Sequence, residues 1–361
     1  MIPMIKRVIK RLLSQSMIDG LRGILDRLDM FFVNVFLSAD GGAKFYYLFF
    51  NKSFNREMRS VIRARARYNK SFAGENPASY SLRRNIHRLE KGLIMRPRRE
   101  CFAESYIQDT IRSLRHCNES KVLGRAEEAW AKSVLTEYFN AVNGNSEVRS
   151  ARELFERYDD ECVHSDSISG HGPMMYSEIS PTAVSFDDLE QLCSRRHSVR
   201  WFEEKAVPKD LIDKAIELAL SAPSACNRQP FKFYVFDKPE RAREIGAIPF
   251  GTAGFSDNFQ CLVVIVGDLS AYPFEKDRHV IYIDTALVAM QFQLALETLD
   301  LGSCIINWAD IEPLEQRMSE ELHLEPFQRP TMLIAVGYPD KASQVPFSAK
   351  RGAEEVIVRL D

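Results

Sequence analysis

The chain has 361 residues and a formal net charge of −2, and 45% of its residues are hydrophobic. This length accommodates two domains, or one large domain with an extension, and the apolar fraction excludes global disorder. The longest apolar stretches are far shorter than the ~18 residues that a membrane-spanning helix needs, so no transmembrane segment is expected. Seven cysteines without a Cys-x-x-Cys pair argue against a disulfide framework or a structural zinc site, and favour a reducing, cytoplasmic compartment.

Charge is distributed unevenly along the chain. Residues 1–100 hold 21 Lys and Arg against 8 Asp and Glu, whereas the remainder holds 27 against 42. Two interpretations stay open: the basic part binds an anionic surface such as a membrane, or it docks on the acidic part of its own chain or of a second copy. Aromatic and arginine residues after position 45 are segregated rather than interleaved, so nucleic-acid binding is not expected.

The N-terminal part is predicted to be mostly helical. Residues 1–17 show one apolar stripe flanked by basic residues, and such a helix could lie on an anionic bilayer or pack on the protein. The stripe comprises Ile5, Val8, Ile9, Leu12 and Leu13. Residues 45–69 are expected to form a helix with an apolar start and a basic end.

Further helices are predicted over residues 81–116, with a break at Arg96-Pro97, and over residues 124–160. His87 has no second ligand at helical spacing, so it is interpreted as a surface residue and no metal site is expected. The polar stretch 161–184, which contains Gly and Pro, is typical of a linker. The chain therefore divides into a basic, mostly helical extension (1–160), a linker (161–184) and a C-terminal domain (185–361).

The C-terminal domain alternates helices and strands. Ser185, followed three residues later by Asp188, predicts the start of a helix that ends near Arg195. Apolar spacing predicts a second helix at 211–219 and a long apolar helix at 282–300. Strands are predicted at 231–236, 261–268 and 331–340.

Two motifs in this domain have unusual polar chemistry. Three arginines and Ser198 lie within residues 195–200, and the guanidinium fork suits phosphate oxygens, although a solvated helix end would also favour arginines. Two prolines bracket the small and amide residues of 223–230, which indicates a shaped loop. A Gly-x-Gly-x-x-Gly run is missing, so a Rossmann dinucleotide site is not indicated.

The stretches RRHSVRWF and APSACNRQPFKFYVF resemble the start of the FMN-dependent nitroreductase family. CLVVIVGD, YIDTALVAMQFQLALETLDLGSC, IINWADI, TMLIAVGYPD and AKRGAEEVIV then follow in the family's order, so the resemblance covers about residues 185–358. It implies an α+β fold, with a mixed sheet wrapped by helices, behind the helical extension. It also implies a homodimer with two FMN sites at the subunit interface, in which the helix 282–300 is similar to the family's dimer helix.

The resemblance also implies the residues that bind the cofactor. The phosphate and ribityl chain would be held by Arg196, Ser198 and Arg200, by the backbone of His197, and by Arg351 and less directly Lys350. Asn227 would hydrogen-bond the pyrimidine edge of the flavin, in a wall shaped by Pro223, Ser224 and Gln229. Asn307 and Trp308 would offer backbone N–H groups to the ring. Trp308 stands where the family often has Gly, so its indole is expected to narrow the pocket above the ring.

These residues predict an FMN-dependent oxidoreductase that passes electrons from NADH or NADPH to a small organic acceptor. The flavin itself would supply the chemistry, so no catalytic acid or base is assigned, and Arg200 would stabilise its anionic reduced form. One alternative is a flavin-dependent dehydrogenase or dehalogenase of a dedicated metabolite. Another is a non-catalytic flavin-binding module that docks through residues 1–100.

Overall fold

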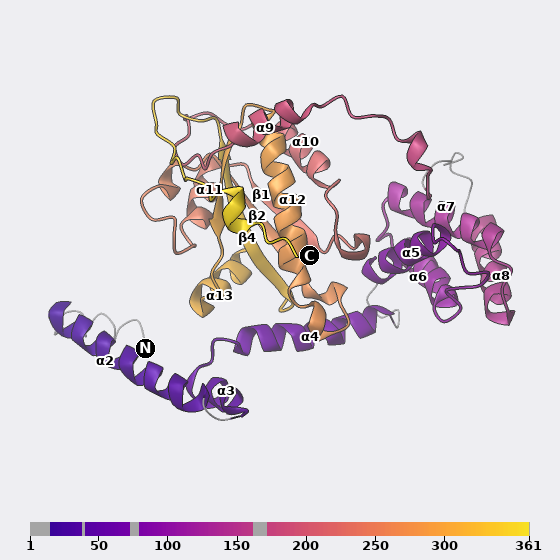
Figure 1. Ribbon diagram of the computed structural model, residues 1–361, viewed down its shortest axis with the longest axis horizontal. Coiled ribbons are helices and arrows are strands. Elements are labelled where there is room, and N and C mark those ends of the chain that lie inside the picture. The colour runs from indigo at the N-terminus through magenta and orange to yellow at the C-terminus, as the bar shows by residue number, and fades with distance from the viewer. Residues whose placement is uncertain (1–14, 38–39, 73–78, 162–171, 361) are drawn as a thin grey trace. The chain divides into compact units, whose positions relative to one another are not determined.

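The computed structural model describes residues 15–37, 40–72, 79–161 and 172–360 (Figure 1). The chain divides into two compact units, Met1–Arg59 and Ser60–Asp361. Most of the helix predicted at 1–17, and residues 162–171 of the predicted linker, lie outside the described residues. The described end of that linker is mostly irregular, with one 3-10 turn at Tyr176–Glu178.

The N-terminal unit is a helical hairpin. It contains α2 (Gln15–Leu37), α3 (Gly42–Phe45) and a π-helix, η1 (Tyr46–Phe50). The rings of Phe32 and Phe36 lie 4.9 and 5.4 Å from that of Phe50, and these contacts join the two arms.

The helix predicted at 45–69 is wrong as a single element. A break at residues 51–54 separates η1 from α4 (Asn55–Phe72). Asn51 has extended backbone angles, and its side-chain oxygen accepts a hydrogen bond from the Ser53 N–H at 2.9 Å. This local side-chain bond competes with the helical pattern, as Asn side chains commonly do.

Four helices form a bundle after residue 79: α5 (Tyr80–Leu93), α6 (Ile107–Glu119), α7 (Arg125–Ala141) and α8 (Ser146–Glu161). On α5, Leu82, Ile86 and Leu89 are buried in the bundle core, at the i, i+4, i+7 spacing of one helix face. The helical character predicted on both sides of Arg96-Pro97 and over 124–160 is thus confirmed, but residues 94–106 are not helical and 124–160 forms two helices, α7 and α8.

The C-terminal domain is built on one four-stranded sheet with the order β1-β2-β4-β3. Its strands are β1 (Phe231–Phe236), β2 (Cys261–Asp268), β3 (Gly302–Asn307) and β4 (Gln328–Gly337). All three strand pairs are antiparallel, and an isolated parallel bridge joins Ser198 to Ser303. The sheet with its covering helices confirms the α+β class.

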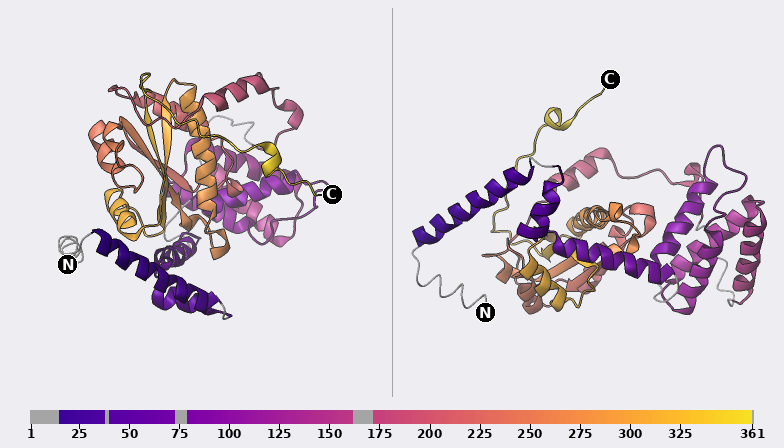
Figure 2. Two further views of the ribbon diagram at one scale, coloured as in Figure 1. Left: turned by 60° about the vertical axis from the view of Figure 1, so that its left-hand side comes forward. Right: turned by 90° about the horizontal axis from the view of Figure 1, so that it is seen from below.

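Helices cover both faces of this sheet (Figure 2). α10 (Lys209–Ala219) and α12 (Val280–Glu297) share one core with Cys261, Val263 and Ile265 of β2. α11 (Pro239–Gly246) and α13 (Glu312–Glu321) share the other with the alternate β2 residues, Leu262, Val264 and Val266. Because both faces of β2 are buried, its sequence is an unbroken apolar run.

One segment of the described chain, Glu275–Glu297, is long and apolar enough to cross a membrane. It contains α12, and half of the apolar window is buried inside the protein. Val288, Ala289 and Phe292 of α12 lie in the core against the sheet. Packing on the sheet therefore accounts for the apolar character of this helix.

The sheet domain also contacts α4 and the start of α5. Val61 and Ala64 of α4 are buried with Leu269, Tyr272 and Ile281. In addition, the Tyr80 hydroxyl donates to Asp268 at the end of β2, at 3.4 Å. These contacts bring the helical bundle beside the loop that precedes β1.

Candidate functional site

A pocket of about 600 Å³ opens between α9 (Phe186–Arg195) and the C-terminal segment 346–350. Four residues from the predicted site line it together: Arg196, His197, Ser198 and Lys350. Local structure explains the position of the first three. Ser185 and Asp188 form a capping box that starts α9, and Arg196 leaves the helix with extended angles. The Val199 N–H then donates to the Ser303 carbonyl at 3.0 Å, which fixes this segment to β3.

The charged residues that line the pocket are Arg196, Lys350 and Glu190, which leaves an excess of one positive charge. The neighbouring Arg195 is engaged elsewhere, because its guanidinium lies 3.3 Å from both Glu297 and Asp300. Burial raises the pKa of Glu297, and Arg195 beside it opposes that rise. Within the described ranges, by contrast, neither Arg196 nor Lys350 has a carboxylate at ion-pair distance. With the Ser198 hydroxyl they form a donor set suited to a phosphate.

The second group of predicted residues lies in the loop 221–230. Cys226, Asn227 and Gln229 have φ values of 54°, 51° and 50°, a left-handed conformation that is costly for residues other than glycine. Hydrogen bonds within the loop hold it. The Gln229 N–H donates to Ser224 Oγ at 3.1 Å, and Gln229 Nε2 donates to Asn227 Oδ1 at 3.2 Å. The Nδ2 group of Asn227 makes no hydrogen bond to a described residue, so it can donate to a ligand.

Buried polar residues contact this loop and stabilise its conformation. Asp284 of α12 accepts the Ala225 N–H at 3.2 Å and the Tyr272 hydroxyl at 3.3 Å. Burial raises the pKa of Asp284, and these hydrogen bonds oppose the rise. The Arg228 guanidinium is buried over the Tyr272 ring, 4.8 Å from its centre. The sequence motifs did not identify Asp284 or Tyr272, because neither lies near the loop in the sequence.

A residue from the helical bundle completes the support. Arg83 of α5 donates through Nε to the Asn227 carbonyl oxygen at 2.7 Å. Its guanidinium also lies 3.1 Å from Glu127 and over the Trp130 ring, both on α7. Arg83 thus connects the bundle to the loop across 144 sequence positions, and no sequence signal indicated this role.

The environment of Trp308 corrects one expectation. Its indole is buried in the core beneath the sheet, and Nε1 donates to Glu315 Oε1 at 2.7 Å. Glu315 also bonds Arg329, which is 2% exposed and lies 2.7 Å from Asp310. Since the indole points into the core, it does not narrow a pocket. The segment Asn307–Asp310 is instead anchored by these buried polar contacts.

The remaining predicted residues, Arg200, Asn307 and Arg351, do not line the pocket beside α9. Arg200 is half-buried, with its guanidinium 5.7 Å from the centre of the Phe255 ring, and Asn307 is exposed at the end of β3. Arg351 pairs with Glu355 at 3.0 Å, one helical turn further on. Lys350, not Arg351, lines the pocket, which reverses the expected order of these two residues.

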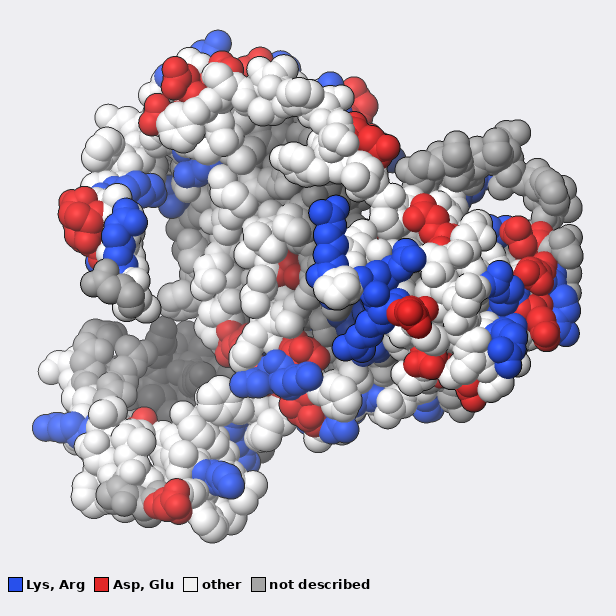
Figure 3. All heavy atoms as spheres, turned by 45° about the vertical axis from the view of Figure 1, so that its right-hand side comes forward, with Lys and Arg blue, Asp and Glu red and all other residues white. Residues whose placement is uncertain are grey.

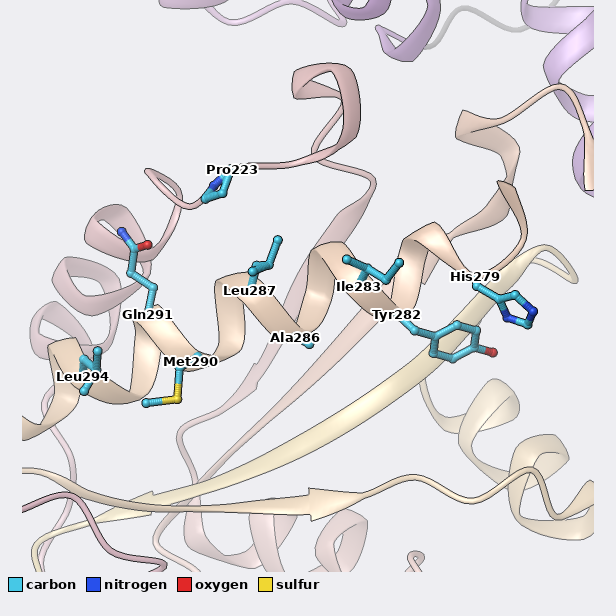
Figure 4. Close-up of a pocket in the computed structure, with 9 residues that line it drawn as sticks. All are labelled: Pro223, His279, Tyr282, Ile283, Ala286, Leu287, Met290, Gln291 and Leu294. Carbon is cyan, nitrogen blue, oxygen red and sulfur yellow. The ribbon is translucent and has the colours of Figure 1, made fainter. Parts of the chain in front are cut away.

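The predicted phosphate-binding residues and the loop residue Pro223 line different pockets of one chain. The loop residue Pro223 lines a second pocket, of about 860 Å³, that runs along α12 (Figure 4). Ile283, Leu287 and Gln291 point to the side of α12 on which Pro223 lies. Ile283 and Leu287 are exposed although α12 is a core helix. One chain therefore presents an open apolar groove beside its loop.

The domain that carries these residues has known relatives. Residues 193–257 and 247–338 match the nitroreductase family. A Methanothermobacter thermautotrophicus protein with the provisional name NADH dehydrogenase/NAD(P)H nitroreductase is 28% identical over 164 residues, which are 43% of this chain and 80% of that protein. Iodotyrosine deiodinase of Haliscomenobacter hydrossis is 24% identical over 194 residues, 46% of this chain and 86% of the relative.

A nitroreductase family protein of Streptococcus pneumoniae has a similar solved structure. It is 26% identical, with a TM-score of 0.42 over 48% of this chain and 100% of that protein. The C-terminal half of the chain belongs to the nitroreductase family, and the protein is an oxidoreductase.

Proposed function

We propose that the protein binds FMN and passes electrons from NADH or NADPH to a small organic acceptor. The observation that carries this proposal is the pocket in which Arg196 and Lys350, without carboxylate partners in the described chain, converge with Ser198. FMN has one phosphate, and this donor set fits it in charge and in chemistry. The family to which the domain belongs supports the same cofactor.

Each group of residues then has a distinct role toward FMN. Arg196, Ser198 and Lys350 hold the phosphate, and Asn227 Nδ2 donates to the polar edge of the ring. The anchored backbone at Asn307 and Trp308 supplies N–H groups. Bound FMN supplies the two-electron redox chemistry, and the protein binds it, orients it and sets its electrostatic surroundings.

Two copies of the chain are needed to complete this site. The phosphate pocket and the Asn227 loop lie on different surfaces, and Pro223 of the loop also lines the groove along α12. A second copy that covers the groove touches the loop and can bring its own phosphate pocket there. The proposed assembly is therefore a homodimer with two composite sites.

Cofactor binding tests the proposal directly. The purified protein should be yellow, and NADH or NADPH should bleach its flavin absorbance without oxygen. Arg196→Ala/Lys350→Ala should weaken FMN binding by at least about a hundredfold, because each of the two lost charged hydrogen bonds costs roughly 1.5–3 kcal/mol. Lys341→Ala is the matched control. A colourless protein that refuses added FMN, or a double variant with unchanged affinity, contradicts the proposal.

A dedicated dehalogenase is the second candidate, because iodotyrosine deiodinases are among the relatives. For that function, the reduced holoenzyme should release iodide from iodotyrosine, which an iodide-selective electrode measures. If neither NADH nor NADPH reduces the bound FMN and no iodide is released, the result would favour the non-catalytic flavin-binding module.

A further inference from the structure

The N-terminal hairpin exposes two apolar faces. On α2, Ile24, Leu28, Phe31 and Val35 are exposed at i, i+4, i+7 and i+11, which forms one stripe. Phe32 and Phe36, on another side of α2, make the contacts within the hairpin. On the second arm, Phe45, Leu48 and Phe49 are also exposed. Both arms therefore retain an apolar face after they have packed together.

Few residues of the hairpin are buried. Of the residues in 15–59 whose burial is described, only Gly42 and Tyr46 are buried. Phe31 is 61% exposed, and Leu48 and Phe49 are each 65% exposed. Monomeric soluble proteins rarely expose contiguous apolar surface on this scale, and such patches usually mark an interaction with protein or membrane. A membrane or another protein surface is therefore expected to cover these faces.

The charge of the unit favours a lipid bilayer over a second copy of the chain as the partner of these faces. Residues 1–59 hold ten Lys and Arg against five Asp and Glu, so the unit has five surplus positive charges; four of these come from residues 1–14, and residues 15–59 hold six against five. Two such units repel each other, whereas each basic residue near an anionic bilayer contributes about 1 kcal/mol of attraction. In Figure 3 the surface of this unit is mostly uncharged, with separated basic and acidic side chains. Apolar faces with a basic surplus are typical of segments that lie in a membrane interface.

We infer that the hairpin within residues 15–59 docks the enzyme on an anionic lipid bilayer. The exposed apolar side chains of α2 and of Phe45–Phe49 enter the interfacial region, and basic residues contact the lipid headgroups. Tyr47, which is half-buried, adds an aromatic ring with a polar tip, and such rings favour the membrane interface. The oxidoreductase domain would then act on a substrate delivered at the membrane surface. This inference does not depend on FMN binding.

Vesicle flotation of the full-length protein tests the inference. The protein should float with vesicles of phosphatidylcholine containing about one-third phosphatidylglycerol, and bind far less to pure phosphatidylcholine or at about 1 M salt. Phe31→Ser/Leu48→Ser removes one side chain from each face without changing the charge, and should lower partitioning by about tenfold or more. Phe250→Ser/Leu360→Ser, at exposed apolar positions of the other unit, is the matched control and should float normally.

Two outcomes overturn the inference. One is a wild-type protein that stays with the unbound fraction on anionic vesicles at low salt. The other is a Phe31→Ser/Leu48→Ser variant that floats as the wild type does. Sedimentation velocity without lipid identifies a second copy as the alternative occupant: the variant would then be a smaller species than the wild type. Lys44→Glu/Lys52→Glu tests the charge separately: it lowers the surplus of residues 1–59 from five to one and should strongly weaken the preference for anionic lipid.

Discussion

Arg83 is the residue through which the helical bundle reaches the proposed flavin loop. Its guanidinium contacts the Asn227 carbonyl while it also pairs with Glu127. Positive φ values at Cys226, Asn227 and Gln229 make the loop costly to hold, so each external hydrogen bond contributes to its conformation. A bundle that lies far from the loop in sequence therefore becomes part of the support for Asn227.

Arg83→Met should weaken FMN binding about tenfold, because one hydrogen bond from a charged donor is lost. Fluorescence titration of FMN measures the affinity, and circular dichroism checks that the bundle remains folded. Arg112→Met on α6 is the control, since Arg112 is exposed and pairs with Asp109 on its own helix. Equal FMN affinity in the Arg83 variant and the wild type would show that the loop does not need this contact.

Asp268 predicts a pH dependence of stability. Burial raises the pKa of Asp268 above its ordinary value of 3.8, and hydrogen bonds from Ser270 oppose the rise. The folded state therefore favours the protonated carboxyl. Its contribution to stability is complete at pH values below the pKa of the unfolded state, and it is lost as pH rises through the pKa of the folded state.

Relative to Asp268→Asn, the wild-type free energy of unfolding should fall as pH increases from about 4 to about 7. Urea unfolding at several pH values measures this difference. A difference that is independent of pH, or that changes in the opposite direction, would contradict the assignment.

At the scale of elements, α9 and the C-terminal segment, which lie at opposite ends of the domain's sequence, form the proposed phosphate pocket. Cys193 of α9 is an exposed thiol that lines this pocket beside Arg196. Cys261 of β2 is buried, and burial raises the pKa of its thiol to about 12. Cys193 is accessible to reagents, whereas Cys261 is both inaccessible and held protonated by its burial, which makes it unreactive in the folded protein.

Bound FMN should therefore slow the alkylation of Cys193 by iodoacetamide. Cys261 should react only after unfolding, and Cys101 in the bundle should react at a rate that FMN does not change. Peptide mass spectrometry of the apoprotein and holoprotein over time measures the three rates. Equal labelling of Cys193 with and without FMN would place the cofactor outside this pocket.

At the scale of the whole molecule, dimerisation and cofactor binding are predicted to be coupled. The groove along α12 exposes Ile283 and Leu287 and is also lined by Pro223 of the proposed flavin loop. In the proposed homodimer, association of two copies would bury this apolar surface and complete the proposed sites.

Leu287→Lys should therefore convert the protein to a monomer and lower its FMN content together. Sedimentation velocity with detection at the flavin absorbance reports both properties in one experiment. Phe250→Lys, an exposed position outside the groove, should change neither. A monomeric variant with full FMN content would show that one chain holds the cofactor alone.

The sequence alone determined the elements and the motifs. Apolar periodicity located α9, α10, β1, β2 and α12, and the order of motifs identified the family, because these features depend on residues close together in the chain. Tertiary structure decided which side chains share a surface. It buried the Trp308 indole, placed Lys350 rather than Arg351 in the pocket, and brought Arg83 to Asn227. Side-chain direction and contacts between distant segments follow from packing of the whole chain, which local patterns do not encode.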